Sequence, residues 1–368
     1  MKPEVRIEWL KVSAYTVPTD FPESDGTYAW DKTTLVLVEA GAGGHTGLGY
    51  TYSHTAAAHL IEDKLASTIT GRDAFDVRSA WASMVYEVRN IGRPGIASSA
   101  IAAVDIALWD LKARLLGVPL LKLFGAAHES VQAYGSGGFT SYSIEQLQRQ
   151  LAGWVEQGMK SVKMKVGTHP EQDVARARAA REAIGPGVNL FVDANGAYSR
   201  KQALEKALAF ADLNITWFEE PVSSDDLAGL RLIRNRAPAG MDIAAGEYGW
   251  DLPYFRRMAE TGAVDVLQAD CTRCAGFTEW LRAGALAAAH SVRYSAHTAP
   301  SLHAHVSCVV LPMYNIEYFH DHVRIEHMLF DGALTAIGGM LHPDLSRPGV
   351  GLELKRQDAE KYKVYESS

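Results

Sequence analysis

The sequence predicts an α/β fold, in which a closed (β/α)8 barrel follows a smaller α+β domain. From residue 131 onward, eight short β-rich runs alternate with amphipathic helical stretches. Before residue 125, strand-like segments come first and a block of helices follows, which is the order of an α+β domain. The eight units occupy about 190 residues, within the lower size range of closed barrels. An open doubly wound sheet is the alternative, but the first strand–helix turn lacks the Gly-x-Gly-x-x-Gly pattern of its nucleotide-binding form.

The composition is that of a globular protein with a large core. Hydrophobic residues make up 47% of the 368 residues and charged residues 21%, which excludes a disordered chain. Lys and Arg number 36 against 43 Asp and Glu, so the net charge is −7 and no basic field exists for nucleic acid. No apolar run approaches the roughly 18 residues of a membrane span, and residues 1–11 do not resemble a targeting segment. Because three cysteines also cannot form an even-numbered disulfide framework, we expect a cytoplasmic protein without nucleic-acid or membrane partners.

The first part of the chain predicts a three-stranded meander followed by three helices. Strand-like alternation covers residues 5–17, residues 33–39 and a run that ends at residue 50, with a glycine turn at 41–44. Apolar residues three and four apart predict helices over 55–69, 74–89 and 97–116. Glycine and proline follow the last helix, and the sequence changes character near residue 125.

Charged residues stand at the ends of the predicted barrel strands. The strands cover residues 131–136, 161–166, 189–193, 215–219, 242–247, 264–270, 292–297 and 314–318, with helices between them such as 144–157 and 277–289. Barrel enzymes carry their catalytic groups at the C-terminal ends of the strands. From the second strand to the eighth, those ends carry Lys163 and Lys165, Asp193, Glu219, Glu247, Asp270, His297 and Glu317.

The three carboxylates on strands three to five predict a divalent metal site. Asp193, Glu219 and Glu247 end neighbouring strands, so their side chains would converge and repel one another unless a cation compensated them. All-oxygen ligands suit Mg²⁺, which keeps positions open for water or substrate oxygens. Each acid could instead cap a helix or form a salt bridge, but three at consecutive strand ends favour the metal site.

Two groups of bases are predicted on either side of these acids. Lys163 and Lys165 are two residues apart on a strand and would both project into the barrel mouth. A second ammonium and a nearby metal would each depress a lysine pKa toward the range of a general base. His297 ends the strand next to Asp270, so a carboxylate could orient its imidazole. Glu317, across the barrel, could hydrogen-bond a metal-held substrate carboxylate.

These motifs resemble those of the enolase superfamily, and within it the mandelate racemase group. The matching segments are Lys163-Met164-Lys165, Val192-Asp193-Ala194-Asn195, Glu219-Glu220-Pro221, Gly246-Glu247, Asp270, Ser295-Ala296-His297, Ile316-Glu317 and the helical run from Ala103 to Asp110. The resemblance implies a capping domain over residues 1–125, a TIM-like (β/α)7β barrel over 126–323, and a return segment over 324–368 that packs on the cap. It also implies a homo-oligomer.

The resemblance further assigns a role to each site residue. Asp193, Glu219 and Glu247 would bind Mg²⁺. Lys165 would be one base, and His297 with Asp270 the other. Lys163 would neutralise the carboxylate of a small-molecule substrate, and Glu317 would stabilise the enolic intermediate.

The residues leave the reaction open among three functions. If the substrate bears a hydroxyl on the carbon next to the one that loses its proton, that hydroxyl can leave as water. The protein is then an acid-sugar dehydratase that forms a 2-keto-3-deoxy acid. If the substrate has no such hydroxyl, the two bases can only move the proton from one face to the other, and the protein is a racemase or epimerase of a 2-hydroxy acid. A non-catalytic barrel that binds carboxylates is a further alternative. Residues 19–30, 50–52, 136–143 and 298–301 are expected to cover the mouth, and their many hydroxyls favour a polyhydroxylated substrate.

A cysteine pair departs from the pattern of the group. Cys271 and Cys274 directly follow Asp270 and form a Cys-x-x-Cys sequence. Only one further cysteine exists and no thioredoxin-like context surrounds the pair, so we expect packed thiols rather than redox or metal chemistry.

Overall fold

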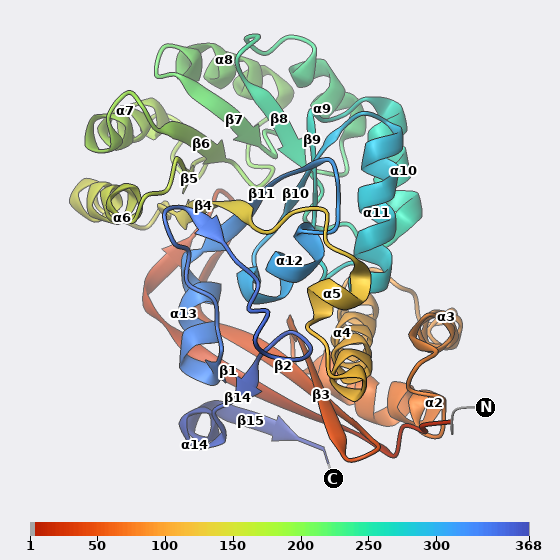
Figure 1. Ribbon diagram of the computed structural model, residues 1–368. Helices are drawn as coiled ribbons and strands as arrows, with labels where there is room; N and C mark the ends of the chain where they lie inside the picture. Colours follow the sequence, from red (N-terminus) through yellow and green to blue (C-terminus); the bar gives the residue numbers. More distant parts are fainter. Residues whose placement is uncertain (1–3, 368) are drawn as a thin grey trace.

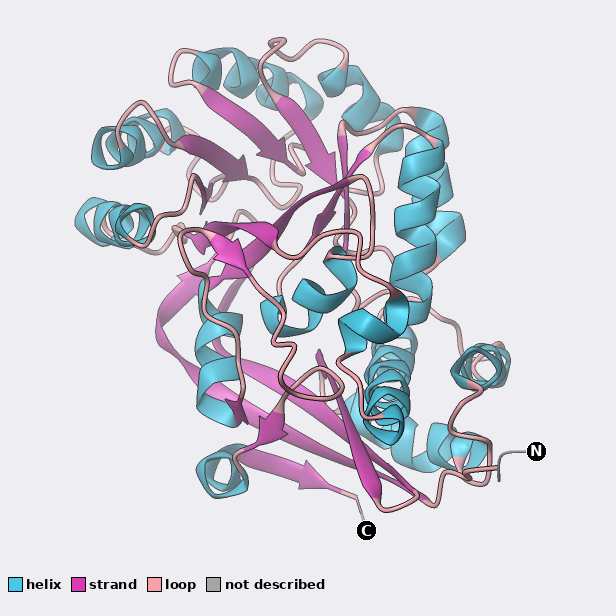
Figure 2. Cartoon of the chain, in the orientation of Figure 1, coloured by secondary structure: helices cyan, strands magenta, loops and turns pink. Residues whose placement is uncertain are grey.

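The computed structural model describes residues 4–367 and contains a parallel β-barrel with a mostly antiparallel cap beside it (Figure 1). Residues 1–3 and 368, which the predicted capping domain and return segment include, lie outside the described residues. Helices surround the barrel strands, whereas the long strands of the cap lie together on one side of the molecule (Figure 2). The described residues contain no helix long and apolar enough to cross a membrane.

The barrel is closed, as the sequence predicts. Its strands pair in parallel in chain order, and the last pairs with the first through Glu317 opposite Tyr134. The eight strands are β4 (Val131–Gly137), β5 (Ser161–Lys165), β6 (Asn189–Asp193), β7 (Ile215–Glu219), β8 (Asp242–Ala245), β9 (Val266–Ala269), β10 (Arg293–Ala296) and β11 (Met313–Phe319). An open doubly wound sheet is therefore excluded.

A helix follows each barrel strand. They are α6 (Ile144–Glu156), α7 (Asp173–Ile184), α8 (Arg200–Ala211), α9 (Leu227–Arg234), α10 (Leu252–Thr261), α11 (Phe277–Ala289), α12 (Pro300–Ser307) and α13 (His320–Leu329). Helix α6 shows why these segments are helical, because Leu147, Leu151 and Trp154 are buried on one face. The Ser143 hydroxyl accepts a hydrogen bond from the Gln146 N–H at its start.

Alternation along the strands decides which side chains enter the barrel. In β5, Val162 and Met164 pack in the main core beneath the helices, so Lys163 and Lys165 point inward. Below the mouth the interior is filled by a separate apolar cluster of Tyr134, Phe191, Trp217, Ala244 and Val266. The barrel is thus packed at one end and polar at the other.

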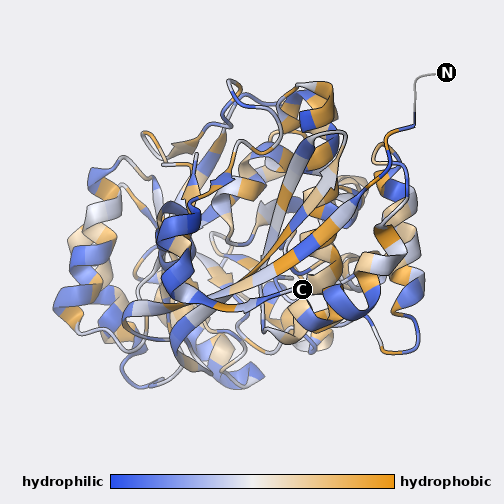
Figure 3. Cartoon of the chain, turned by 90° about the horizontal axis from the view of Figure 1, so that it is seen from below, coloured by the Kyte–Doolittle hydropathy of each residue, from blue (hydrophilic) through white to orange (hydrophobic). Residues whose placement is uncertain are grey.

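The cap is a four-stranded antiparallel sheet packed against helices. Its strands lie in the order β15 (Lys363–Glu366), β1 (Trp9–Ser24), β2 (Ala29–Ala42) and β3 (His45–Tyr52). Hydrophilic and hydrophobic stretches alternate along the long strands (Figure 3). The helical segments are α1 (Ala56–Leu60), the π-helical η1 (Ile61–Leu65), α2 (Ala66–Ile69), α3 (Val77–Glu87), α4 (Ile96–Leu116) and α5 (Leu120–Phe124).

Strand β3 approaches α4 so closely that it requires glycine. A Cβ atom at Gly49 would lie 2.3 Å from the backbone oxygen of Ala103, which no ordinary contact permits. Gly47 meets the next turn of α4 in the same way. Consequently α4, which is buried along most of its length, lies directly on the sheet.

The predicted loop over residues 19–30 is instead the end of one long hairpin. Strand β1 runs on to Ser24 and β2 begins at Ala29, with a shift of register between Pro18 and Glu23. Alternation is lost across this irregularity, which is why the sequence pattern ends at residue 17.

The chain after α13 contacts both parts of the molecule. Strand β13 (Met340–Leu341) pairs with barrel strand β4, whereas β15 pairs with β1 of the cap. The remaining elements are β12 (Phe330–Asp331), β14 (Glu353–Leu354), α14 (Arg356–Ala359) and the 3-10 turn η2 (Glu360–Tyr362).

Candidate active site

Three buried carboxylates converge at the barrel mouth. Asp193 and Glu219 are the last residues of β6 and β7 and lie opposite each other in the sheet, and Glu247 follows β8. One oxygen from each lies within 4.8 Å of one oxygen from each of the others. Burial and the charge of Asp193 raise the pKa of Glu219, although Lys163 opposes them. The cluster is thus a concentration of negative charge with oxygen donors only.

Lys165 lies beside these carboxylates, opposite Asp193 in the adjoining strand. Its Nζ is 2.5 Å from Asp193 Oδ2, and its side chain lines the cavity above the barrel. Burial lowers the pKa of Lys165, but the charges of Asp193, Glu247 and Glu317 together outweigh burial and the pKa is raised. The predicted depression of this pKa included the effect of a bound metal ion, so it stays a prediction. Lys163 does lower the pKa of Lys165, but the neighbouring carboxylates raise it by more.

Lys163 is fully buried beneath the mouth. Its Nζ lies 2.7 and 2.8 Å from the two oxygens of Glu219 and 2.8 Å from Glu317 Oε1. The ammonium also lies 5.2 Å from the centre of the Tyr134 ring. Lys163 is not among the residues that line the cavity, so of the predicted pair only Lys165 reaches the mouth.

His297 and Asp270 form the predicted pair. His297 Nδ1 is 2.9 Å from Asp270 Oδ2, which leaves Nε2 facing the carboxylates of Glu247 at 3.1 Å and Glu317 at 3.5 Å. Burial lowers the pKa of His297, but Glu247 and Glu317 raise it more, to about 9. Burial raises the pKa of Asp270, but its hydrogen bond to His297 and the charges of His297 and Arg273 together lower it more, so Asp270 stays ionised. The imidazole therefore carries its second proton at neutral pH.

Glu317 links the two sides of the site. Its Oε1 accepts a hydrogen bond from Ser136 Oγ at 2.6 Å and meets Lys163, and its Oε2 faces His297. Burial raises the pKa of Glu317, whereas Lys163 and His297 lower it more. Glu317 is thus an ionised carboxylate between two cations.

Arg273 is a further site residue that the sequence did not single out. Its Nη1 lies 3.3 Å from Glu247 Oε1 and its Nε lies 3.7 Å from Asp270 Oδ2, while its guanidinium stacks on Tyr248. Arg273 thus connects one predicted metal ligand to the carboxylate that orients His297. The sequence signal for Arg273 is its position between Cys271 and Cys274, in the segment directly after Asp270.

The cap supplies the outer wall of one cavity of about 440 Å³ that Lys165 and His297 both line. As predicted, residues 19–30, 50–52 and 298–301 contribute, but residues 136–143 do not, and Tyr50 is instead buried in the core. The cap contributes Asp25, Thr27, Tyr28, Trp30, Lys32, Thr33, Thr34, Tyr52 and Ser53. Among the described residues that line the cavity there is no Ala, Val, Leu, Ile or Met.

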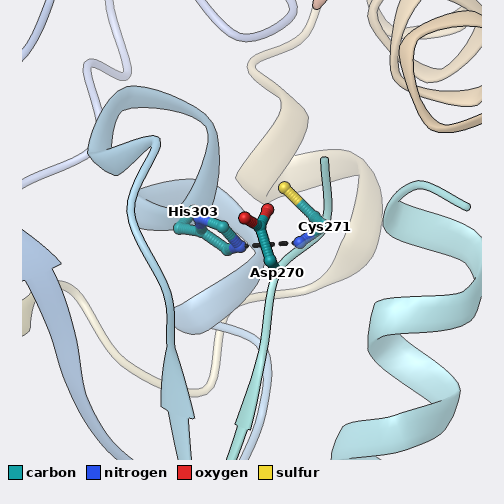
Figure 4. A group of neighbouring side chains, drawn as sticks. All are labelled: Asp270, Cys271 and His303. Carbon is teal, nitrogen blue, oxygen red and sulfur yellow. Dashed lines mark hydrogen bonds between the residues drawn. The ribbon is translucent and has the colours of Figure 1, made fainter. Parts of the chain in front are cut away.

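A second cluster of potential metal ligands lies beside the site and consists of Asp270, Cys271 and His303 (Figure 4). The Cys271 N–H donates to His303 Nε2 at 2.9 Å, and His303 Nδ1 lies 2.7 Å from the Thr298 carbonyl oxygen. Both ring nitrogens are therefore occupied by backbone partners. Burial also raises the pKa of the Cys271 thiol, so the cluster offers neither a free imidazole nor a thiolate.

The fold and site define a parallel barrel with buried acidic and basic side chains gathered at the strand ends. Family models match the chain as "Mandelate racemase / muconate lactonizing enzyme, N-terminal domain" over residues 11–125 and as "Enolase C-terminal domain-like" over residues 146–359. The chain therefore belongs to the mandelate racemase and muconate lactonizing enzyme family of the enolase superfamily, as its motifs predict.

Three relatives illustrate the range of this family. L-talarate/galactarate dehydratase of Salmonella typhimurium is 31% identical over 96% of this chain and 90% of its own. Its structure with Mg and L-lyxarohydroxamate has a TM-score of 0.89 at 28% identity and covers 100% of this chain and 95% of that chain. 3,6-anhydro-alpha-L-galactonate cycloisomerase of Streptomyces coelicolor is 32% identical over 95% of this chain and 98% of its own. A mandelate racemase/muconate lactonizing enzyme-like protein from Rubrobacter xylanophilus has a TM-score of 0.96 at 56% identity and covers 98% of this chain and 100% of that chain.

Proposed function

We propose that this protein is a Mg²⁺-dependent acid-sugar dehydratase that converts an aldonate or aldarate to a 2-keto-3-deoxy acid. The observation that carries the proposal is that Lys165 and His297 line one cavity beside three converging carboxylates, with Asp270 hydrogen-bonded to His297 from behind. A protein that only binds carboxylates needs neither base. A dehydratase among the relatives, with 31% identity, supports the same class of reaction.

The donor set fits magnesium. Asp193, Glu219 and Glu247 offer only oxygens, and their mutual repulsion is partly compensated by Lys163 and Lys165. These three residues would hold the ion. Bound there, Mg²⁺ would stabilise the charge that develops on the substrate carboxylate and offset the carboxylates that now raise the pKa of Lys165.

The chain's own residues divide the work between proton removal and proton donation. Lys165, as a neutral amine, takes the proton from the carbon next to the carboxylate, and the electron pair moves toward the carboxylate to form an enediolate. Lys163 and Glu317 lie 2.8 Å apart beneath the cavity, and their charges would act on that group from below without lining the cavity themselves. His297 then donates its proton to the departing hydroxyl, which leaves as water, and the resulting enol becomes the keto acid.

The lining of the cavity favours dehydration. Its side chains are hydroxyl, amide, charged and aromatic groups, which can pair with the hydroxyls of a sugar acid. Glu317 and Asp270, which are not among the proposed metal ligands, both face His297 and favour the protonated imidazole that a general acid requires. A racemase or epimerase of a 2-hydroxy acid would use the same two bases, and we keep it as the alternative.

The proposal is tested by incubation with a panel of aldonates and aldarates in D₂O with Mg²⁺. A keto acid is expected. Deuterium uptake with inversion and without keto acid would select the racemase, and neither change with any acid would overturn the enzyme assignment. Lys165→Ala and His297→Asn should each lower turnover at least about 100-fold. The exposed Lys160→Ala and His169→Asn serve as matched controls and should leave turnover unchanged.

A further inference from the structure

A third group of metal-ligand side chains lies outside the barrel mouth, where the cap hairpin meets the barrel. Asp20 and Glu23 belong to the end of β1, and His320 is the first residue of α13, directly after barrel strand β11. One donor atom from each lies within 4.8 Å of one donor atom from each of the others. The site residues proposed above are not part of this group.

Glu23 has a donor atom that the protein leaves unused. The side chain is 1% exposed, and its Oε2 accepts a hydrogen bond from Trp30 Nε1 at 2.8 Å. Its Oε1 is buried and has no hydrogen-bond partner among the described residues. Such a carboxylate oxygen normally has a partner, so its presence beside two further donors indicates a missing ligand.

The spacing of the other two donors is compatible with one ion. His320 Nε2 lies 2.9 Å from Asp20 Oδ2. This distance is that of a hydrogen bond, whereas two ligands of one tetrahedral Zn²⁺ with bonds of about 2.0–2.2 Å stand about 3.3–3.6 Å apart. Binding of the ion would replace this hydrogen bond and move the two donors apart by roughly 0.5 Å. Asp20 and His320 also line a surface cavity of about 340 Å³, which gives an ion a route to the cluster.

The surrounding charge also favours a dication. When ionised, Asp20, Glu23 and Asp321 carry three negative charges, and Arg324 supplies one positive charge through its 2.7 Å contact with Asp321. A divalent cation would balance the group.

We propose that Asp20, Glu23 and His320 form a second metal site, selective for a transition-metal dication such as Zn²⁺ over Mg²⁺. One imidazole nitrogen with two carboxylate oxygens suits such ions, whereas Mg²⁺ prefers oxygen ligands alone. The ion would join the β1–β2 hairpin of the cap to the start of α13. Because Glu23 also holds Trp30, which lines the substrate cavity, the site would fix part of the cavity wall.

The test is the Zn²⁺ content of the full-length protein after dialysis against Zn²⁺ with excess Mg²⁺. His320→Gln is expected to retain about one Zn²⁺ per chain less than the wild type and to bind that ion at least about tenfold more weakly. His169→Gln is the matched control, because His169 is an exposed histidine 4.0 Å from Glu171, and its Zn²⁺ content should equal that of the wild type.

The wild type should also show a higher thermal midpoint with Zn²⁺ than with Mg²⁺ alone, and His320→Gln should not. Equal Zn²⁺ content in the wild type and His320→Gln would overturn the proposal, since any Zn²⁺ in the barrel site is unaffected by this substitution. Glu23→Gln provides a second variant if His320→Gln fails to fold, with the same expected loss. Turnover of the Mg²⁺-loaded enzyme reports on the barrel site and keeps the two proposals separate.

Discussion

Two buried histidines beside Asp270 show how similar surroundings give different chemistry. His297 follows β10 at the barrel mouth, and His303 lies in α12 behind it. The second nitrogen of His297 faces the carboxylates of Glu247 and Glu317, whereas both nitrogens of His303 bond to backbone atoms. The pKa of His297 is raised to about 9, while burial lowers the pKa of His303.

The difference lies in the partners rather than in burial or distance. Carboxylates stabilise a second proton on His297, and that proton can later be transferred. The backbone partners of His303 use one donor and one acceptor, so they require the neutral ring and hold it in one tautomer. His303 thereby ties the segment after β9, which carries Asp270, to the segment after β10, which carries His297.

The largest effect is expected from removing the charge that orients His297. Asp270→Asn should lower turnover by about 10²–10⁴-fold, because the amide stabilises neither the imidazolium nor its tautomer. Asp270 also contributes to the raised pKa of His297, so the corresponding limb of the pH–rate profile should move to lower pH. Asp265→Asn is a control near the same strand that does not touch His297, and it should leave the profile unchanged. An unchanged profile in Asp270→Asn would remove the distinction between the two histidines.

The sequence predicted the barrel and the mouth residues because both depend on short-range patterns. The alternation in β5 places Lys163 and Lys165 inward, and unit spacing brings Asp193, Glu219 and Glu247 to one edge. The pKa of a buried side chain depends instead on all the charges that surround it in the folded structure. The raised pKa of Lys165 therefore could not be read from its lysine neighbour.

Two further features also lay beyond sequence patterns. The hairpin over residues 19–30 contains an irregular register, so its strand pairing appears only when β2 is beside β1. His303 acts through backbone atoms of Cys271 and Thr298, and backbone partners leave no signature in residue types.

A smaller effect is expected at His303 than at Asp270. His303→Ala leaves the Cys271 N–H and the Thr298 carbonyl without this partner, which should cost about 1–3 kcal/mol of unfolding free energy for each buried group left unpaired. Turnover should fall by no more than about 10²-fold, through small displacements of Asp270 and His297.

The pH–rate profile distinguishes a positioning role for His303 from a purely structural one. If His303 positions the pair, the limb assigned to His297 should shift in His303→Ala, and His303→Gln, which offers one donor and one acceptor, should partly restore it. A loss of stability with an unshifted profile would make His303 structural only. A loss of turnover as large as that of Asp270→Asn without a loss of stability would place His303 in the chemistry itself.

The smallest effect is expected at the thiol that shares the His303 cluster. Cys271 contributes its backbone N–H to His303, and its thiol is buried with a raised pKa, so Cys271→Ala should leave turnover and Mg²⁺ dependence unchanged. Its unfolding free energy should fall by about 0.5–1.5 kcal/mol, the cost of deleting a group about the size of one buried methylene. Cys274→Ala, a second buried thiol in the same segment, is the matched control. A loss of turnover or of bound metal in Cys271→Ala alone would show that the cluster around His303 takes part in the reaction, and the contrast with His297 would then fail.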